Sequence, residues 1–397
     1  MDDILEDRRR IKKSLIEEAF TPHTPVVDDL FCGRKKEIES IIEGLSEKGN
    51  HIVLYGDRGV GKTSLARYSC RKYEETENTD TNNIMVSCCA NDTFQSVIEK
   101  VFTELGVELV EAVQSASEVK LDVKFLGYSR EKSGSIKNTI NFDNPAWVAN
   151  KLKDNKGVVI IDEFDTIKDS IEKQKFSTLM KILSDKSSNL SLLIVGISLS
   201  VNDLIEGHRS IDRCLSQVYL KRMTKDELLS IIQKGENRTG LKFNEDVKNK
   251  IVEKSLGFPY YVHMLALEAS KNAVLSERNE INNEDYKEGL KNTITKIDYS
   301  LRDMYQEAIG FNDSTEKKRI IYAAAKIGDK GTFTMKAWIE SYKYIYNADI
   351  KNVTINSTMK KNISKDGLRL ITSIKRGLYI FNDSRLPCYI LLLGKPE

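Results

Sequence analysis

The segment from His51 to Thr63 constrains this chain more than any other part of its sequence. An apolar stretch, Ile-Val-Leu-Tyr, runs directly into Gly-Asp-Arg-Gly-Val-Gly-Lys-Thr, which matches the phosphate-loop pattern G-x-x-x-x-G-K-[ST]. In such a loop the glycines let backbone N–H groups face phosphate oxygens, the lysine reaches the β- and γ-phosphates, and the threonine hydroxyl binds Mg²⁺. The segment therefore predicts a Mg²⁺–nucleotide site formed by consecutive residues. These are Gly56, Asp57, Arg58, Gly59, Val60, Gly61, Lys62, Thr63 and Ser64.

A second motif supplies the carboxylates that such a site needs. The apolar run Gly-Val-Val-Ile-Ile from Gly157 ends in Asp162 and Glu163, as a buried parallel strand and its carboxyl end would. Ligands bind at the carboxyl ends of strands in open α/β sheets. We therefore expect Asp162 to join Thr63 as a Mg²⁺ ligand and Glu163 to polarise the attacking water. Asp165 is interpreted as a turn or helix-capping residue rather than a catalytic one.

Alternating patterns around these motifs predict the fold class of residues 28–222. Apolar stretches typical of strands alternate with amphipathic stretches typical of helices, which predicts a parallel sheet with helices on both faces. The strands are expected at 51–55, 84–89, 157–161, 191–196 and 217–220, and the helices near 62–73, 93–106, 145–153, 171–184 and 199–205. Residues 111–141 interrupt this alternation and are interpreted as a β-hairpin insertion or a plain surface loop.

The remaining parts of the chain differ from this core. Residues 1–27 are predicted to form an N-terminal helix (2–19) and a linker, and residues 223–300 an all-helical lid without strands. Residues 301–397 show three helical patterns and then a strand pair, which predicts a winged helix-turn-helix. The expected elements are helices at 316–326, 334–346 and 356–363, strands at 368–375 and 378–381, and a trailing apolar stretch from Cys388.

Composition limits the location and the partners. With 40% hydrophobic and 30% charged residues, no membrane-length apolar stretch, a charged N-terminus and six cysteines without metal-site spacing, a cytoplasmic protein without a membrane partner is expected. The net charge of +2 conceals an asymmetry: residues 315–397 contain 16 Lys or Arg and 7 Asp or Glu. This basic end is either a nucleic-acid surface or an ordinary solvated one.

The order of phosphate-loop core, helical lid and winged helix resembles the AAA+ initiator-type ATPases, which include the origin-recognition ATPases, and their STAND relatives. The resemblance covers residues 28–397 and implies an enzyme that converts ATP and water into ADP and phosphate, with ATP or ADP and Mg²⁺ bound. It assigns the segment Phe-x-Gly33-Arg34-x-x-Glu to the neighbourhood of the adenine. It also implies that Ser198, after the stretch Leu-Leu-Ile-Val-Gly-Ile, contacts the γ-phosphate or the attacking water as sensor 1.

Two features depart from the usual AAA+ pattern. The stretch Gly-Phe-Pro259-Tyr-Tyr contains no arginine where AAA+ proteins place sensor 2, and it is similar to the STAND pattern, in which the proline lies near the adenine. An arginine finger would come from the region before the last core strand, with Arg213 as the first candidate and Arg209 as the second. A finger supplied to a neighbour's ATP requires a homo-oligomer in the ATP state.

Two functions remain open from the sequence. The first is a nucleotide-dependent switch in bacterial or archaeal defence or signalling, whose winged helix has a protein effector as its partner. The alternative is an initiator-like or transposon-targeting ATPase that binds DNA through basic residues of the winged helix. These residues are Lys360, Lys361, Arg369, Lys375 and Arg376. The missing sensor 2 arginine favours the switch, whereas the basic C-terminal region favours DNA binding.

Overall fold

The computed structural model describes the chain except residues 1, 27, 78–81, 108–139, 199, 206–208, 311–313 and 365–368. The described residues form two compact units. The α/β unit contains Arg34–Gly56 and Lys62–Leu220. The second unit contains Met1–Gly33, Lys221–Glu397 and the five residues Asp57–Gly61 from the tip of the phosphate loop.

A five-stranded parallel sheet is the centre of the α/β unit, as predicted. Its strand order is β2-β3-β4-β1-β5, so the strand that carries the phosphate loop lies between two neighbours. The strands are β1 (His51–Gly56), β2 (Ile84–Ser87), β3 (Lys156–Asp162), β4 (Asn189–Ile197) and β5 (Leu215–Leu220). The carboxyl ends of β1, β3 and β4 therefore meet at one edge of the sheet, which is where the predicted site residues follow.

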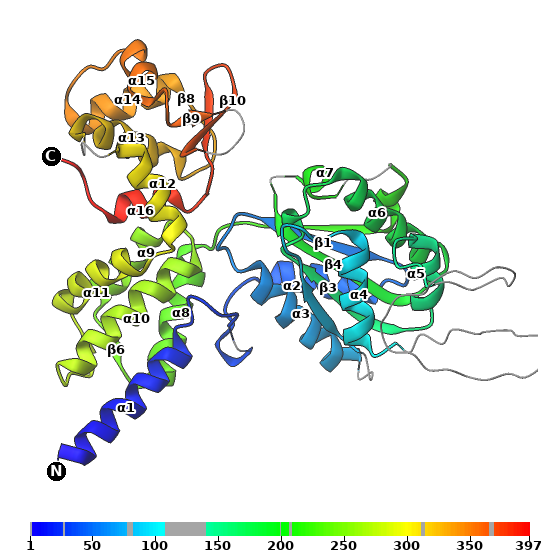
Figure 1. Ribbon diagram of the computed structural model, residues 1–397. Helices are drawn as coiled ribbons and strands as arrows, with labels where there is room; N and C mark the ends of the chain where they lie inside the picture. The colour runs from blue at the N-terminus through cyan, green and yellow to red at the C-terminus, as the bar shows by residue number, and fades with distance from the viewer. Residues whose placement is uncertain are drawn as a thin grey trace, which may run out of the picture. The chain divides into compact units, whose positions relative to one another are not determined.

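Helices cover both faces of this sheet (Figure 1). One face carries α2 (Lys35–Ser46) and α3 (Lys62–Glu77), and the other carries α4 (Phe94–Leu105), α5 (Pro145–Leu152) and α6 (Ser170–Asp185). The larger apolar core lies on this second face, where Phe176 packs edge-on against Phe94 and Phe164. The short helices η2 (Phe164–Thr166), α7 (Val201–Leu204) and η3 (Arg209–Cys214) complete the unit. The predicted insertion at 111–141 lies outside the described residues apart from its last two.

A histidine at the start of β1 connects this strand with β4 and α6. His51 is fully buried, its Nδ1 accepts a hydrogen bond from the Leu192 backbone N–H (3.0 Å), and its Nε2 lies 2.8 Å from the Met180 carbonyl. Because Nδ1 accepts, Nε2 carries the proton and donates. Burial lowers the pKa of His51 to about 4, so the ring is neutral at physiological pH.

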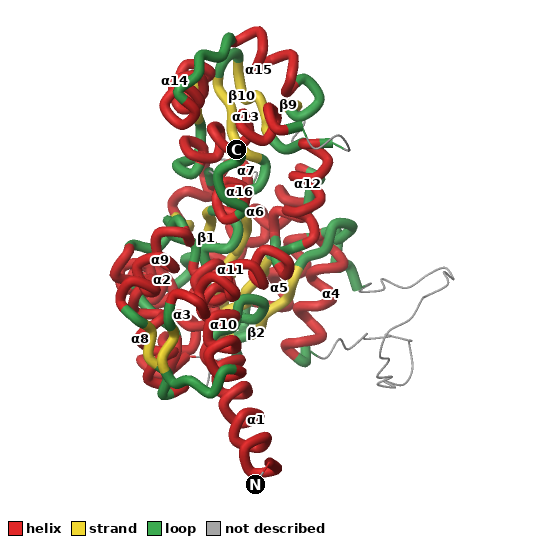
Figure 2. The backbone as a smooth tube through the Cα atoms, turned by 90° about the vertical axis from the view of Figure 1, so that its left-hand side faces the viewer, coloured by secondary structure: helices red, strands yellow, loops and turns green. Residues whose placement is uncertain are grey.

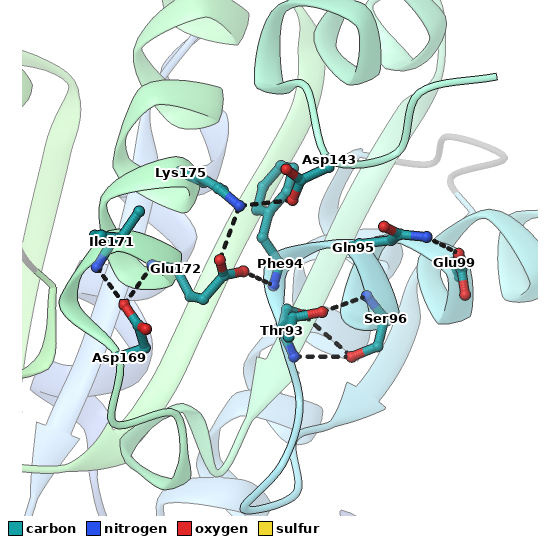
Figure 3. Close-up of polar contacts among 10 residues, drawn as sticks. All are labelled: Thr93, Phe94, Gln95, Ser96, Glu99, Asp143, Asp169, Ile171, Glu172 and Lys175. Carbon is teal, nitrogen blue, oxygen red and sulfur yellow. Dashed lines mark hydrogen bonds and ion pairs between the residues drawn. The ribbon is translucent and has the colours of Figure 1, made fainter. Parts of the chain in front are cut away.

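Side chains hold the first turns of α4 and α6 together (Figure 3). The Glu172 carboxylate accepts a hydrogen bond from the Phe94 backbone N–H (2.6 Å) and pairs with Lys175 (2.8 Å), which also pairs with Asp143 (2.6 Å). Asp169 caps α6 by accepting from the Ile171 backbone N–H (2.7 Å). Both helices follow carboxyl ends of strands, so this network fixes that edge of the unit.

The lid region of the second unit is mainly helical, as predicted. Its helices are α8 (Lys225–Thr239), α9 (Glu245–Ser255), α10 (Pro259–Leu275), α11 (Asn283–Lys296) and α12 (Tyr299–Ile309). The expectation of no strands was wrong in detail, because the two-residue strands β6 (Lys242–Phe243) and β7 (Glu280–Ile281) pair in parallel. They are too short for any periodic pattern in the sequence.

The N-terminal segment packs on this lid. It consists of α1 (Asp2–Ala19), which matches its predicted bounds, and the short helix η1 (Asp28–Leu30). Phe20 fills the space beside Gly235 of α8: a Cβ at that glycine would lie 2.1 Å from the ring. Lys234 donates to the carbonyls of Asp29 and Phe31 (2.8 and 2.7 Å), which secures the linker on α8. No helix among the described residues is long and apolar enough to cross a membrane.

The described residues of the C-terminal module form four helices and a four-stranded sheet of order β8-β11-β10-β9 (Figure 2). Its elements are α13 (Thr315–Gly328), β8 (Phe333–Thr334), α14 (Met335–Tyr346), α15 (Asn352–Met359), β9 (Ile363–Ser364), β10 (Ile371–Lys375), β11 (Leu378–Phe381) and α16 (Leu386–Leu392). The strand pair β10–β11 is antiparallel, as predicted. One expectation was wrong in its bounds: the helix expected at 356–363 is α15, which begins at Asn352 and ends at Met359. The apolar stretch from Cys388, for which no element was predicted, lies in the buried helix α16. Periodicity does not distinguish a short, fully buried helix from a strand.

Candidate nucleotide site

The α/β unit brings the two predicted Mg²⁺ ligands together. Thr63, in the first turn of α3, donates its hydroxyl to Asp162 Oδ2 at 2.7 Å, and Asp162 lies at the end of β3 with 6% of its surface exposed. The Glu163 backbone N–H donates to the other carboxylate oxygen (2.9 Å) and fixes its orientation. Two adjacent oxygen donors of this kind suit Mg²⁺, which prefers carboxylate and hydroxyl oxygens. These residues therefore fit the metal that the phosphate loop implies.

Lys62 is folded back over the beginning of the loop. Only 9% of its surface is exposed, and its Nζ donates to the Gly56 carbonyl at 3.1 Å. A buried ammonium group is expensive unless charged or polar groups surround it. Its place among the backbone groups of the loop is therefore the one expected for a phosphate-binding lysine.

Glu163 has an unusual backbone conformation. Its φ of 55° and ψ of 31° are left-handed, which costs a residue with a Cβ about 1–2 kcal/mol. The Thr166 side chain and backbone N–H both donate to the Glu163 carbonyl (2.8 and 2.9 Å), and this η2 turn holds the strained residue. The Glu163 side chain is exposed at the sheet edge, where a catalytic carboxylate has to meet substrate.

The end of β4 contains Ser198 and a bond that the sequence did not reveal. Ser198 donates its hydroxyl to the Ser200 carbonyl (2.6 Å) and accepts from the Ser200 N–H (3.2 Å). Just before it, the Ile197 backbone N–H donates to Asp165 Oδ1 at 2.7 Å. Asp165 does belong to a turn, but its carboxylate also reaches the neighbouring strand. The sequence signal was slight: an acid two residues after Glu163.

In the second unit, lid residues lie against the loop tip, residues 57–61. Gly59 has a φ of 79°, and a Cβ there would lie 3.0 Å from Arg385 Cδ and 3.7 Å from Tyr260 Cβ. The Pro259 ring lies 3.9 Å from the corresponding point on Gly61. Gly59 is therefore required both for its conformation and for its close neighbours.

Arg385 is the centre of a buried ion cluster beside this tip. It is 3% exposed and donates from Nε and NH2 to the Asp383 carboxylate (3.0 and 2.8 Å) and from NH1 to Asp298 (2.5 Å). Tyr260 donates to the same Asp298 (3.0 Å). Burial alone would lower the pKa of Arg385, but the two carboxylates outweigh it and raise the pKa.

A second arginine strengthens the same contact. Arg222 pairs with Asp57 of the loop tip (3.2 Å) and donates to the Ser384 carbonyl (3.5 Å). We call Asp298, Asp383, Ser384, Arg385 and Arg222 the clasp. Sequence reasoning missed all five, because no local pattern connects residues 383–385 with Arg222, Asp298 and the phosphate loop, which lie far away in the chain.

The predicted adenine-side residues adopt special backbone conformations. Gly33 and Arg34 have φ values of 69° and 63°, and Arg34 is 5% exposed before the start of α2. In the second unit, a Cβ on Gly33 would lie 2.5 Å from Glu227 Oε1. Both residues are therefore structurally constrained, which leaves their role toward a nucleotide base as a prediction.

The finger candidate Arg213 has a partner within its own unit. Its guanidinium pairs with Asp185 at 2.6 Å, and its side chain is 65% exposed in η3. An exposed pair of this kind contributes little to stability, on the order of 0–1 kcal/mol. Arg213 is thus accessible and weakly held. The side chain of Arg209 lies outside the described part of the chain.

The parallel sheet with a phosphate loop after β1 and an acidic pair after β3 defines a P-loop NTPase. The sequence model for novel STAND NTPase 1 matches residues 18–302, and the chain belongs to this family. Membership makes it a nucleotide-hydrolysing protein, in agreement with the site geometry. No curated protein matches the sequence.

Solved structures of similar fold include origin-recognition proteins. Cdc6p from Pyrobaculum aerophilum is 15% identical over 95% of this chain and 97% of its own, with a TM-score of 0.51. The Aeropyrum pernix ORC1 protein in complex with DNA is 16% identical over 95% and 96%, with a TM-score of 0.50. The ORC2 protein of the same organism, in ADPNP–ADP complexes, is 13% identical over 91% and 92%, with a TM-score of 0.51. At these identities the likeness concerns the fold alone.

Proposed function

We propose that this NTPase is an ATP-driven switch in bacterial or archaeal defence or signalling, which hydrolyses ATP slowly to ADP and phosphate. Lys62 binds the phosphates, Thr63 and Asp162 hold Mg²⁺, Glu163 orients the attacking water, and Ser198 contacts the γ-phosphate or that water. Bound Mg²⁺ would neutralise charge on the phosphate oxygens. Gly33, Arg34 and Pro259 line the adenine, and the C-terminal module acts as a winged helix with a protein effector.

The observation that carries the switch proposal is the clasp at the loop tip. Arg385 belongs to the C-terminal module, yet its side chain contacts Gly59 of the phosphate loop. A module that contacts the loop responds to the nucleotide only if it binds one nucleotide state better than another. We propose that the clasp favours the ADP state and opens when ATP replaces ADP.

The test measures ADP release and assembly in the full chain. We expect Arg385→Ala to release a fluorescent ADP analogue roughly tenfold faster than wild type. A loss of about 1.4 kcal/mol of coupling free energy between the clasp and ADP corresponds to a tenfold change in affinity. The variant should also form ATP-dependent oligomers at lower protein concentration. Arg376→Ala, which removes an exposed charge from the same module, should change neither property. Arg385→Lys guards against a folding defect. Unchanged release and assembly in folded Arg385 variants would refute the switch.

We further propose that Arg213 acts as the finger between subunits of a homo-oligomer. Its exposure and its weak pair with Asp185 support this role, since a finger has to leave its resting partner. Turnover per subunit should then rise with protein concentration and be lost in Arg213→Ala. Asp185→Asn, which frees the same arginine, should preserve or increase turnover. Equal losses in both variants would assign Arg213 a structural role instead.

A second candidate function, DNA binding, is favoured by the charge of the C-terminal module. Five exposed cations lie after α15 and along the β10–β11 hairpin: Lys360, Lys361, Arg369, Lys375 and Arg376. The exposed side chains of α15 include Asn352, Asn356 and Ser357, which are suited to hydrogen bonds with base edges.

Salt dependence tests this alternative. Each phosphate contact that is removed should lower the salt slope of duplex affinity by about 1. Lys375→Ala and Arg376→Ala should both reduce the slope, whereas Lys291→Ala on α11, an exposed lysine of the lid, should not. Absence of binding at low salt would eliminate DNA as the partner.

A further inference from the structure

We infer that Asp165 is a positioning residue that couples Glu163 to Ser198. This inference rests on the roles proposed for those two residues. It concerns only the α/β unit, and it assigns a task to a carboxylate that neither the phosphate nor the metal site uses. Asp165 acts by accepting one hydrogen bond from the backbone of β4.

The hydrogen-bonded pairing between β3 and β4 ends before β4 does. Their parallel pairing ends at Ile161 and Ile194, because β3 turns away at Asp162. β4 continues for three more residues, to Ile197, where it still pairs with β1. The Ile197 N–H would lose its acceptor on the β3 side, and Asp165 Oδ1 supplies one at 2.7 Å. The carboxylate thus replaces the missing part of the ladder.

Asp165 also packs closely against β4. A Cβ at Gly196 would lie 3.2 Å from both the backbone N and Oδ1 of Asp165, and 2.5 Å from the Leu204 side chain. Glycine is therefore needed at this position for Asp165 to approach the strand. Because side chain and backbone of Asp165 both lie against β4, the contact has little freedom to shift.

The Asp165–Ile197 hydrogen bond connects the segments that carry Glu163 and Ser198. On one side, Asp165 lies in the η2 turn that holds Glu163 in its left-handed conformation. On the other side, Ile197 directly precedes Ser198. Two residues that act on the same water need a mutual placement within fractions of an ångström, and misplacement by 1 Å costs about a hundredfold in rate. The Asp165–Ile197 bond fixes this placement.

Three substitutions separate geometry from charge. Asp165→Asn keeps an oxygen acceptor in place and should retain kcat within about threefold, since a neutral acceptor loses only part of the bond. Asp165→Ala removes the acceptor, and Asp165→Glu moves the carboxylate by one methylene. Both should lower kcat roughly tenfold to a hundredfold. Nucleotide affinity should remain within about twofold of wild type in all three variants, because no phosphate or metal ligand is changed.

Asp169→Ala is the matched control. Asp169 also accepts a backbone N–H at 2.7 Å, but its donors, the N–H groups of Ile171 and Glu172, belong to the first turn of α6. The variant should lose about 1 kcal/mol of stability and keep its kcat. Equal kcat losses in Asp165→Ala and Asp169→Ala would show a general stability effect and overturn the inference. Full activity in Asp165→Glu with loss in Asp165→Asn would also overturn it, because the charge would then be what matters.

A double variant distinguishes this inference from the proposed function. If Asp165 acts through Glu163, Asp165→Ala should cause little further loss in a Glu163→Gln background. A normal rate in Glu163→Gln alone would refute the role of Glu163, and with it the coupling through Glu163, whatever the Asp165 variants show. Independent, additive losses would refute the coupling while leaving the role of Glu163 intact.

Discussion

Replacing Arg385 with methionine should destabilise the second unit strongly. Methionine keeps most of the side-chain volume but leaves Asp383 and Asp298 without their cation. Asp383 is only 8% exposed, so its charge has little access to water. Removing one partner of a buried ion pair costs about 3–5 kcal/mol, because the remaining charge stays buried and unpaired. We expect a loss in this range, and the two carboxylates that share Arg385 place it toward the upper end.

The assay is equilibrium unfolding by urea, followed at a probe in the second unit. A matched triple variant, Arg385→Met with Asp383→Asn and Asp298→Asn, removes all three charges together. It should recover most of the lost stability, since uncharged groups of similar size often replace a buried pair without net cost. A loss below about 1 kcal/mol in the single variant, or no recovery in the triple variant, would refute this account of the cluster.

Two further predictions concern the phosphate loop and acid stability. Lys62→Ala should abolish nucleotide binding in equilibrium titration, whereas Lys291→Ala, an exposed lysine on α11, should bind normally. The second prediction concerns Asp298. Burial alone would raise the pKa of this carboxyl group, but the charge of Arg385 and the hydrogen bond from Arg385 outweigh burial and hold the pKa below the usual Asp value. This stabilisation is present above the unfolded-state pKa of about 3.9 and is lost as pH falls through the folded-state pKa. The free energy of unfolding of Arg385→Met should lack this pH-dependent contribution from Asp298. A pH dependence of stability identical to that of wild type would contradict the prediction.

Much of the α/β unit could be predicted from the sequence because its strands are buried on both faces. Such strands read as short apolar runs, and the phosphate loop and the acidic pair fix where two of them end. The five strands, the flanking helices and the pairing of Thr63 with Asp162 follow from these features. The stretch 386–392 was left without an assigned element because every residue in it is buried, so no polar face marks its helical period.

The clasp and the Asp165 bond could not be predicted for a different reason. Each joins residues that the fold brings together but that no spacing rule relates, as for Arg385 and Gly59. An aspartate after the acidic pair looks the same in sequence whether it caps a turn or reaches the next strand. Only the early end of the β3–β4 pairing, which leaves the Ile197 N–H without a strand partner, determines that Asp165 accepts this bond.

Charge balance at the loop tip leads to a last prediction about nucleotide preference. Arg385 is neutralised by two aspartates, so its removal leaves two negative charges within one side-chain length of Gly59. These charges lie closer to the loop tip than the screening length of about 8 Å at physiological salt, so they repel a phosphate group bound there. The repulsion grows with phosphate charge, so in Arg385→Met it should oppose the shift of affinity from ADP toward ATP that loss of the clasp produces. The triple variant should show the larger shift toward ATP, since it removes the same side chain without leaving the charges. If the ratio changed equally in both variants, the contact of Arg385 with the loop, rather than its charge, would set the preference.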